Sequence, residues 1–110
     1  MKKTNLDNCG TLPDFGNFCV DYSEGSDPVC EEWYDMYKGV AELMPFAKSV
    51  SAKSYDFDDN GNETKIDYAK MIDIIKKNNY KGFIGVEYEG SRLDEVEGIL
   101  ATKNLIQRLL

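Results

Sequence analysis

A pair of acidic side chains follows the most strand-like stretch of the sequence. Residues 82–90 read Gly-Phe-Ile-Gly-Val-Glu-Tyr-Glu-Gly, a short apolar run that ends on Glu87 and Glu89. Side chains two residues apart in a strand point to the same face, so the two carboxylates should project together, roughly 6.6 Å apart along the strand. In α/β proteins, ligands bind at the carboxyl ends of the strands. These acids therefore favour metal coordination or proton transfer.

Composition and charge exclude several other classes of function. The 110 residues include 13 basic and 20 acidic side chains, for a formal charge of −7. No basic cluster could neutralise phosphates, so we expect neither nucleic acid nor an anionic membrane as a partner. No histidine occurs, which excludes Ser-His-Asp or Cys-His catalysis within this chain and leaves oxygen atoms as the ligands for any metal. The sequence contains no run of about 18 apolar residues, so it predicts no membrane span.

The cysteines favour a reducing environment. Cys9, Cys19 and Cys30 are odd in number and lack CxxC spacing, which argues against a disulfide framework or a zinc site. We expect reduced, buried thiols in a cytoplasmic protein. The first residues also lack the apolar core of a signal peptide.

Three strands should alternate with three helices. The strands are expected near residues 9–14, 47–53 and 82–88. The first helix should begin at Pro28 after an Asp27 cap and end at Pro45, and capping patterns at 64–67 and 91–94 precede the other two. The amphipathic pattern of the helices is expected to run through Val29, Trp33, Met36, Val40 and Leu43 or Met44; Ile66, Ala69, Ile72 and Ile75; and Leu93, Val96, Ile99 or Leu100, Lys103, Ile106 and Leu110.

This alternation predicts a single α/β domain of three β-α units with parallel strands and right-handed crossovers. A parallel sheet of three strands has two open edges, although parallel sheets are normally buried on both faces. Loops and helices could cover the edges, copies of the chain could pair, or the chain could be part of a larger protein. A homo-oligomer formed through the sheet edges is our expectation.

Three phrases of the sequence resemble one family of enzymes. They are Leu12-Pro-Asp-Phe-Gly-Asn-Phe18, Ser49-Val-Ser-Ala-Lys53 and Gly85-Val-Glu-Tyr-Glu-Gly90. Their order and spacing are similar to the last three strands of the sugar phosphate isomerase/epimerase family, xylose isomerase-like (β/α)8 TIM barrels related to AP endonuclease family 2. The resemblance implies that the chain is units six to eight of such a barrel. A whole barrel needs about 250 residues, so one copy would have an incomplete active site.

The resemblance also implies a site for a sugar or sugar phosphate. Asp14 and Glu87 match metal ligands, for which Mn²⁺ or Mg²⁺ is suited, and Glu87 matches a residue that takes part in proton transfer. Asn17 falls where a substrate-contacting residue often lies. Lys53 matches a basic position that could stabilise an enolate or bind phosphate. Ser51 stands where the family has a histidine ligand, and a further glutamate ligand has no counterpart here.

Less specific interpretations remain open for each of these residues. Asp14 and Glu87 could be solvated acids, and Lys53 could simply neutralise Glu87 on the adjacent strand. The loop at 56–62 begins like an EF-hand calcium loop but is also typical of a solvated turn. Trp33, Tyr34 and Tyr37 could form a carbohydrate platform on one helical turn, or pack in a core or interface. The alternative function is a self-associating structural domain without catalysis.

Overall fold

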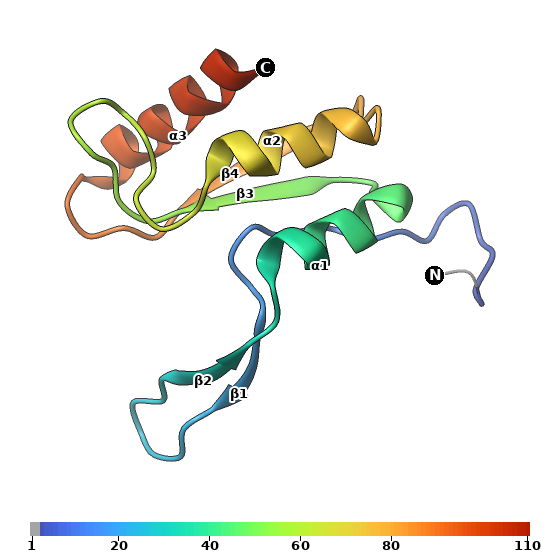
Figure 1. Cartoon of the computed structure of the whole chain (residues 1–110), viewed down its shortest axis with the longest axis horizontal. Helices are drawn as coiled ribbons and strands as arrows, with labels where there is room; N and C mark the ends of the chain where they lie inside the picture. The colour runs from blue at the N-terminus through green and yellow to red at the C-terminus, as the bar shows by residue number, and fades with distance from the viewer. Residues whose placement is uncertain (1–2) are drawn as a thin grey trace.

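The computed structural model describes residues 3–110. Its elements, in chain order, are β1 (Cys19–Tyr22), β2 (Cys30–Trp33), α1 (Met36–Leu43), the 3-10 helix η1 (Met44–Phe46), β3 (Val50–Ser54), α2 (Tyr68–Lys77), β4 (Ile84–Tyr88) and α3 (Glu95–Leu109). β1 and β2 form an antiparallel hairpin, and β3 and β4 form a parallel pair. The hairpin extends away from the helices and from the parallel pair (Figure 1). The mixed α/β class is therefore confirmed.

The parallel sheet is smaller than predicted. β3 and β4 pair in continuous register from Val50 with Ile84 to Ser54 with Tyr88. The expected strand at 9–14 is reduced to two isolated parallel bridges, Thr11 with Ala47 and Asp14 with Ser51. Pro13 lies between these bridges and has no N–H to donate, although its carbonyl accepts the N–H of Ser51 at 2.8 Å. Three complete parallel β-α units are not formed within residues 3–110.

One face of the parallel pair is covered and the other is partly open. Val50 and Ala52 of β3 are buried in a core to which all three helices contribute. The alternate residues of β3 lie on the opposite face, where Lys53 pairs in register with Glu87. Glu87 is exposed on this face. A parallel sheet with one open face is unusual, because such sheets are normally covered on both.

The predicted first helix begins eight residues late. Residues 30–33 form β2, and α1 begins only at Met36, where the Asp35 carboxylate accepts the N–H groups of Tyr37 at 2.9 Å and Lys38 at 3.1 Å. Asp27 therefore does not cap a helix. The apolar spacing from Val29 onward suited a helix, but pairing with β1 decided the conformation because local propensity is weak beside tertiary contacts.

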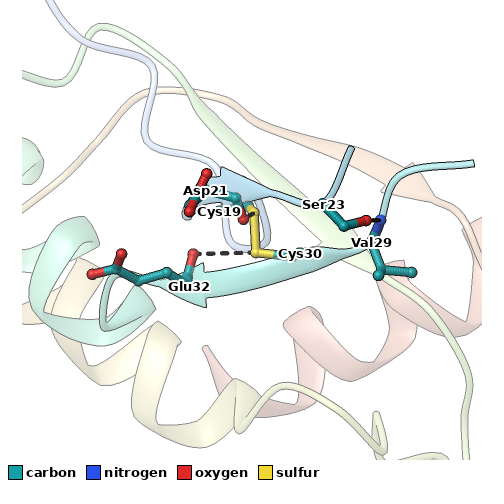
Figure 2. Close-up of a disulfide and its surroundings, with 6 residues drawn as sticks. All are labelled: Cys19, Asp21, Ser23, Val29, Cys30 and Glu32. Atoms are coloured by element: carbon teal, nitrogen blue, oxygen red, sulfur yellow. Dashed lines mark hydrogen bonds between the residues drawn. A yellow bond between two sulfur atoms is a disulfide. The ribbon is translucent and has the colours of Figure 1, made fainter. Parts of the chain in front are cut away.

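Two of the three cysteines are not the buried thiols that we predicted. Cys19 and Cys30 form a disulfide across the hairpin, as Figure 2 shows. Their Cα atoms are 5.9 Å apart. Cys9 is free but exposed. The odd number of cysteines concealed a bridge because the antiparallel turn brings residues 19 and 30 together, a proximity that sequence spacing alone does not reveal. The cytoplasmic prediction was based on reduced thiols, and two of the three cysteines are instead in a disulfide.

The last two helices begin where the predicted capping patterns end, but their caps are Asp67 and Asp94 and not Thr64 and Ser91. In α2 the expected Ile72 and Ile75 are buried, as is Ile66 just before it, whereas Ala69 is exposed. In α3 the prediction of the buried face is mostly wrong. The helix buries Gly98, Thr102, Leu105 and Ile106, and leaves exposed Val96, Ile99, Leu100 and Leu110.

Gly98 explains the orientation of α3. A Cβ atom at this position would lie 2.2 Å from the ring of Tyr88, so only glycine lets the helix approach β4 this closely. The packed face thus consists of Gly98 and Thr102 together with Leu105 and Ile106, in place of Val96, Ile99 and Leu100. Within residues 3–110, none of the helices has the length and apolar character that a bilayer crossing requires.

Candidate functional site

Lys53 lies at the centre of a group of polar side chains near the carboxyl ends of β3 and β4. The residue is only 5% exposed. Its Nζ donates a hydrogen bond to Asn17 Oδ1 at 3.0 Å and lies 3.5 Å from Glu89 Oε1 and 3.8 Å from Glu87 Oε2. Asp14 also acts electrostatically on this ammonium. We call Asp14, Asn17, Lys53, Glu87 and Glu89 the lysine cluster.

The cluster keeps Lys53 protonated. Burial by itself lowers the pKa of the Lys53 ammonium, but the carboxylates of Asp14, Glu89 and Glu87 together outweigh this effect and leave the pKa above its ordinary value. A lysine with a raised pKa is a permanent cation at neutral pH and cannot serve as a general base. Any proton acceptor in the cluster must therefore be a carboxylate, and the ammonium can only donate hydrogen bonds and stabilise negative charge.

The two glutamates come from β4 and its extension. Lys53 and Glu87 are partners in the parallel register, and the N–H of Glu89 donates to Ser54 O at 2.8 Å, which continues the ladder beyond β4. Both carboxylates reach the same ammonium, so the prediction that they share one face is confirmed. Their side chains remain 48% and 47% exposed. A ligand can thus reach them while Lys53 itself stays buried.

Asp14 and Asn17 approach Lys53 from the other side of β3. Asp14 bridges to Ser51, and its carboxylate accepts the N–H of Gly16 at 2.8 Å, which folds the turn back over Lys53. A Cβ atom at Gly16 would lie 2.7 Å from Lys53 Cδ and 2.9 Å from the Tyr55 hydroxyl. Glycine is needed for this close approach. The four residues predicted from the sequence as site residues are therefore brought together in space.

Two tyrosines support the cluster. The hydroxyl of Tyr68 donates to the carbonyl oxygen of Lys53 at 2.5 Å. Burial raises the pKa of Tyr68 strongly, and the nearby Glu63 carboxylate adds to the effect. Burial is also the main reason that the pKa of Tyr55 is raised. Both phenols are neutral at ordinary pH, so Tyr68 fixes the backbone at Lys53 and Tyr55 can donate a hydrogen bond.

A surface cavity of about 470 Å³ adjoins the cluster. It shares Gly16 and Tyr55 with the surroundings of Lys53 and is lined by Gly16, Trp33, Met36, Tyr55, Lys65 and Ile66. Trp33 is 57% exposed. Aromatic and apolar walls next to a few convergent polar groups are typical of sites for small organic ligands.

The aromatic platform that we considered does not exist as a single helical turn. Trp33 belongs to β2, Tyr34 lies in the connection, and Tyr37 is on α1. The Tyr37 hydroxyl instead accepts the N–H of Asp67 at 3.0 Å and so ties α1 to the start of α2. Trp33 alone of the three lines the cavity beside the lysine cluster.

The lysine cluster does not by itself fit a divalent metal ion. Among residues 3–110, no three acidic or thiol side chains gather closely enough to hold one. The Lys53 ammonium pairs with Glu87, the proposed ligand, and its field reaches Asp14, the other one. A metal held by Asp14 and Glu87 would need to displace this cation and recruit further oxygen ligands.

The loop at 56–62 uses its oxygen atoms internally. Asp58 Oδ1 accepts the N–H groups of Asn60 and Asn62, each at 2.9 Å, and Gly61 has a φ of 77°, as expected for the Asn-Gly turn. Asp56 Oδ1 accepts the N–H groups of Ser91 and Arg92 at 3.1 Å, and the Arg92 contact is the main reason that the pKa of Asp56 lies below its usual range. The arrangement is that of a structural turn.

Glu89 is the member of the lysine cluster to which the family resemblance gave no role. Its carboxylate is nevertheless closer to Lys53 than that of Glu87. The i, i+2 spacing of the two acids was the signal that could have identified it. No comparable signal pointed to Tyr55 or Trp33. Tyr55 lies just beyond the predicted strand at 47–53, and Trp33 was assigned to a helix although it belongs to β2.

Parts of the chain are similar to proteins described as C-glycoside deglycosidase alpha subunits. One from Arthrobacter globiformis is 38% identical over 60 residues, which are 54% of this chain and 15% of that protein. A second from the same species is 35% identical over 49 residues, and one from Microbacterium trichothecenolyticum is 33% identical over 48 residues; each match covers 44% of this chain and 13% of the relative. The matches span 15% or less of each relative's length. No protein family profile matches the chain.

These findings correct the resemblance drawn from the sequence. The relatives are described as C-glycoside deglycosidase subunits and not as sugar phosphate isomerases or epimerases. The sheets of residues 3–110 have two strands each and give no sign of a TIM barrel. The broader expectation of a similarity to sugar-related enzymes is supported, because a C-glycoside contains a sugar. The three phrases misled because short strand ends with acids recur in unrelated α/β sites.

Proposed function

We propose that this chain contributes a sugar-binding, proton-transferring surface to a protein that acts on C-glycosides. The observation that carries the proposal is a buried, protonated Lys53 within 4 Å of two half-exposed carboxylates, beside a cavity with aromatic walls. The similarity to C-glycoside deglycosidase subunits supports the substrate class.

The proposed chemistry is removal of a carbon-bound proton next to a carbonyl of the sugar. Glu87 is the general base, because Lys53 is held protonated and Glu87 is exposed enough to meet a ligand. The Lys53 ammonium stabilises the oxyanion that develops on the carbonyl oxygen as the proton leaves. Isomerases and epimerases use the same proton transfer, and an enzyme of that type is what the sequence predicted. No step is assigned to a metal.

Recognition of the ligand is divided between the cavity and the cluster. Trp33 and Tyr55 offer flat apolar surface to one face of a sugar or its aglycone, and Asn17 offers an amide to a hydroxyl group. Lys53 already uses Asn17 as an acceptor, so a bound hydroxyl or phosphate oxygen would compete for the same ammonium.

Nuclear magnetic resonance tests the proposal at the residue level. We expect titration with a simple C-glycoside to shift amide signals of residues 14–17, 53–55 and 87–89 in the 110-residue chain. A keto sugar in D₂O should exchange its α-proton, and Glu87→Gln should slow this exchange by about 10² to 10⁴-fold, the usual contribution of a general base. Asp73→Asn is the control, because Asp73 forms its ion pair with Lys77 on the exposed surface of α2, away from the lysine cluster.

Two results would reject this function. One is the absence of ligand-induced shifts near Lys53, or shifts that are unchanged in Lys53→Met. The other is exchange at the same rate in Glu87→Gln and wild type. Shifts that persist without exchange would leave a binding surface only, and would remove Glu87 from the mechanism.

A divalent metal bound by Asp14 and Glu87 is a separate proposal. The oxygen chemistry of the two acids supports Mn²⁺ or Mg²⁺, but the paired Lys53 ammonium opposes it. We therefore propose that Mn²⁺ or Mg²⁺ binds at Asp14 and Glu87 only when oxygen ligands from outside the described residues complete the coordination.

Self-association is the competing function and is supported by different features. β4 pairs only with β3, so its other edge has free backbone groups in the part of the chain described. α3 also leaves Val96, Ile99 and Leu100 exposed on one helical face. We propose that two copies associate through the β4 edge and this apolar stripe of α3, a contact that is compatible with a sugar site on the chain.

A further inference from the structure

We propose that the β1–β2 hairpin is a recognition arm that docks on a basic, partly apolar surface of a different protein. The arm comprises residues 19–33. It extends from the molecule in Figure 1 and is clamped by the Cys19–Cys30 disulfide in Figure 2. The proposal does not depend on the sugar site, because no arm residue proposed for docking belongs to the lysine cluster or lines the adjoining cavity.

The arm exposes apolar side chains that its own fold does not cover. Val20 is 58% exposed, Tyr22 59% and Val29 65%. Figure 2 shows Val29 at the end of the hairpin beside Ser23, whose hydroxyl accepts the Val29 N–H at 2.9 Å. An isolated two-stranded hairpin is marginal in water. A shape held by a disulfide and spread with uncovered apolar groups is therefore suited to binding.

Charge identifies the kind of partner. The arm contains five carboxylates and no lysine or arginine, so it carries −5 of the chain's formal −7. Two arms of separate copies would repel each other, because like charges facing across an interface are costly. A surface with basic groups around an apolar patch complements the arm in both respects, since interfaces typically combine a buried apolar centre with a polar rim.

The disulfide sets the strength of binding through preorganisation. Cys19 and Cys30 are eleven residues apart in sequence, so the bridge holds both strands in register before a partner arrives. Rigidity of this kind increases affinity by reducing the ordering that binding requires. The Cys30 sulfur also lies 3.2 Å from the Glu32 carbonyl oxygen, a contact without a shared proton once the sulfur is bridged.

Fluorescence anisotropy with defined peptides tests the arm. The probe is a labelled 18-residue peptide of leucine and lysine at helical spacing, and the comparison peptide has serine in place of leucine. We expect the leucine–lysine peptide to bind at least tenfold more tightly than the serine–lysine peptide. The double variant Tyr22→Ser/Val29→Ser should lose at least tenfold in affinity, and Cys19→Ser/Cys30→Ser should lose several-fold.

The controls separate docking from general charge attraction. Glu31→Lys/Glu32→Lys should abolish binding, whereas Glu95→Lys/Glu97→Lys makes the same charge change on α3 and should leave most of it. Circular dichroism verifies that each variant is folded. Equal binding of both peptides, equal effects of the two charge reversals, or self-association that is lost in Tyr22→Ser/Val29→Ser would each overturn the proposal.

Discussion

Lys53 is the residue on which the candidate site depends. Its ammonium is buried, yet three carboxylates keep it charged. A cation of the protein's own thus fills the place between the acids that a bound ion would need. The exposed halves of Glu87 and Glu89 are what remains available to a ligand.

Removing this ammonium should create affinity for metal ions. In Lys53→Met the buried stem keeps its approximate volume, but Asp14, Glu87 and Glu89 lose their neutralising partner. We expect the variant to bind Mn²⁺ at least tenfold more tightly than the wild type in a titration followed by electron paramagnetic resonance. Lys77→Met, which removes an exposed lysine paired with Asp73, should change nothing. Equal Mn²⁺ affinity in wild type and Lys53→Met would show that the lysine does not block an ion.

The titrating groups near the cluster predict a loss of stability at alkaline pH. Lys53 has a folded-state pKa above the ordinary lysine value of 10.5, so its contribution to stability is complete below about pH 10 and is lost as the pH rises further. Tyr55 and Tyr68 have raised pKa values as well, and the folded state holds them neutral while the unfolded chain ionises them. All three effects have the same sign.

Urea unfolding at pH 8 and pH 11 measures this loss. We expect a large fall in the free energy of unfolding for the wild type. Tyr68→Phe should be less stable at pH 8 because the Lys53 carbonyl loses its donor, but should lose less between the two pH values. A fall of the same size in Tyr68→Phe would mean that its phenol does not contribute.

At the scale of elements, the packing of α3 depends on Gly98. Helix propensity alone predicts that Gly98→Ala stabilises by about 1 kcal/mol. The contact with the Tyr88 ring predicts the opposite, because a Cβ atom would come within 2.2 Å of it. We expect a net destabilisation of about 1–3 kcal/mol by overpacking, measured by thermal or urea unfolding. Asn104→Ala on the exposed side of the same helix should instead be neutral or slightly stabilising.

The hairpin is an element whose conformation depends on its bridge. A loop of this length is held by about 3 kcal/mol of chain entropy in the usual loop-closure treatment. Reduction with dithiothreitol should therefore speed amide exchange in residues 19–33 and leave exchange in β3 and α2 unchanged, because the hairpin is not part of the buried core. Faster exchange in α2 after reduction would show that arm and core unfold together.

At the scale of the whole molecule, the free edge of β4 and the exposed stripe of α3 predict self-association. Light scattering coupled to gel filtration should give at least a dimer for the wild type. Ile99→Glu/Leu100→Glu should shift it toward a monomer, since charges on the apolar stripe oppose burial. Gln107→Glu, elsewhere on the exposed side of α3, should not. A monodisperse wild-type monomer at high concentration would contradict the interface.

Much of the local structure was determined by the sequence itself. The caps at Asp67 and Asp94, the apolar face of α2, the strand at Ile84–Tyr88 and the shared face of Glu87 and Glu89 all follow from interactions within a few residues. Such features can be recognised because caps and alternation leave a short-range pattern. The grouping of Asp14, Asn17, Lys53 and Glu87 was also expected, but it came from the family resemblance and not from a local pattern.

Only the tertiary structure decided the rest. Val29 and Trp33 had helical spacing, but both lie in the β1–β2 hairpin, whose strands are joined by the Cys19–Cys30 disulfide. Most of the predicted stripe of α3 faces outward, because Gly98 admits Tyr88 and turns the helix. The Lys53 ammonium meets the carboxylates of both glutamates, Glu89 included, through a register that no single segment encodes. Each depends on contacts between residues distant in sequence, whose energies exceed local preferences.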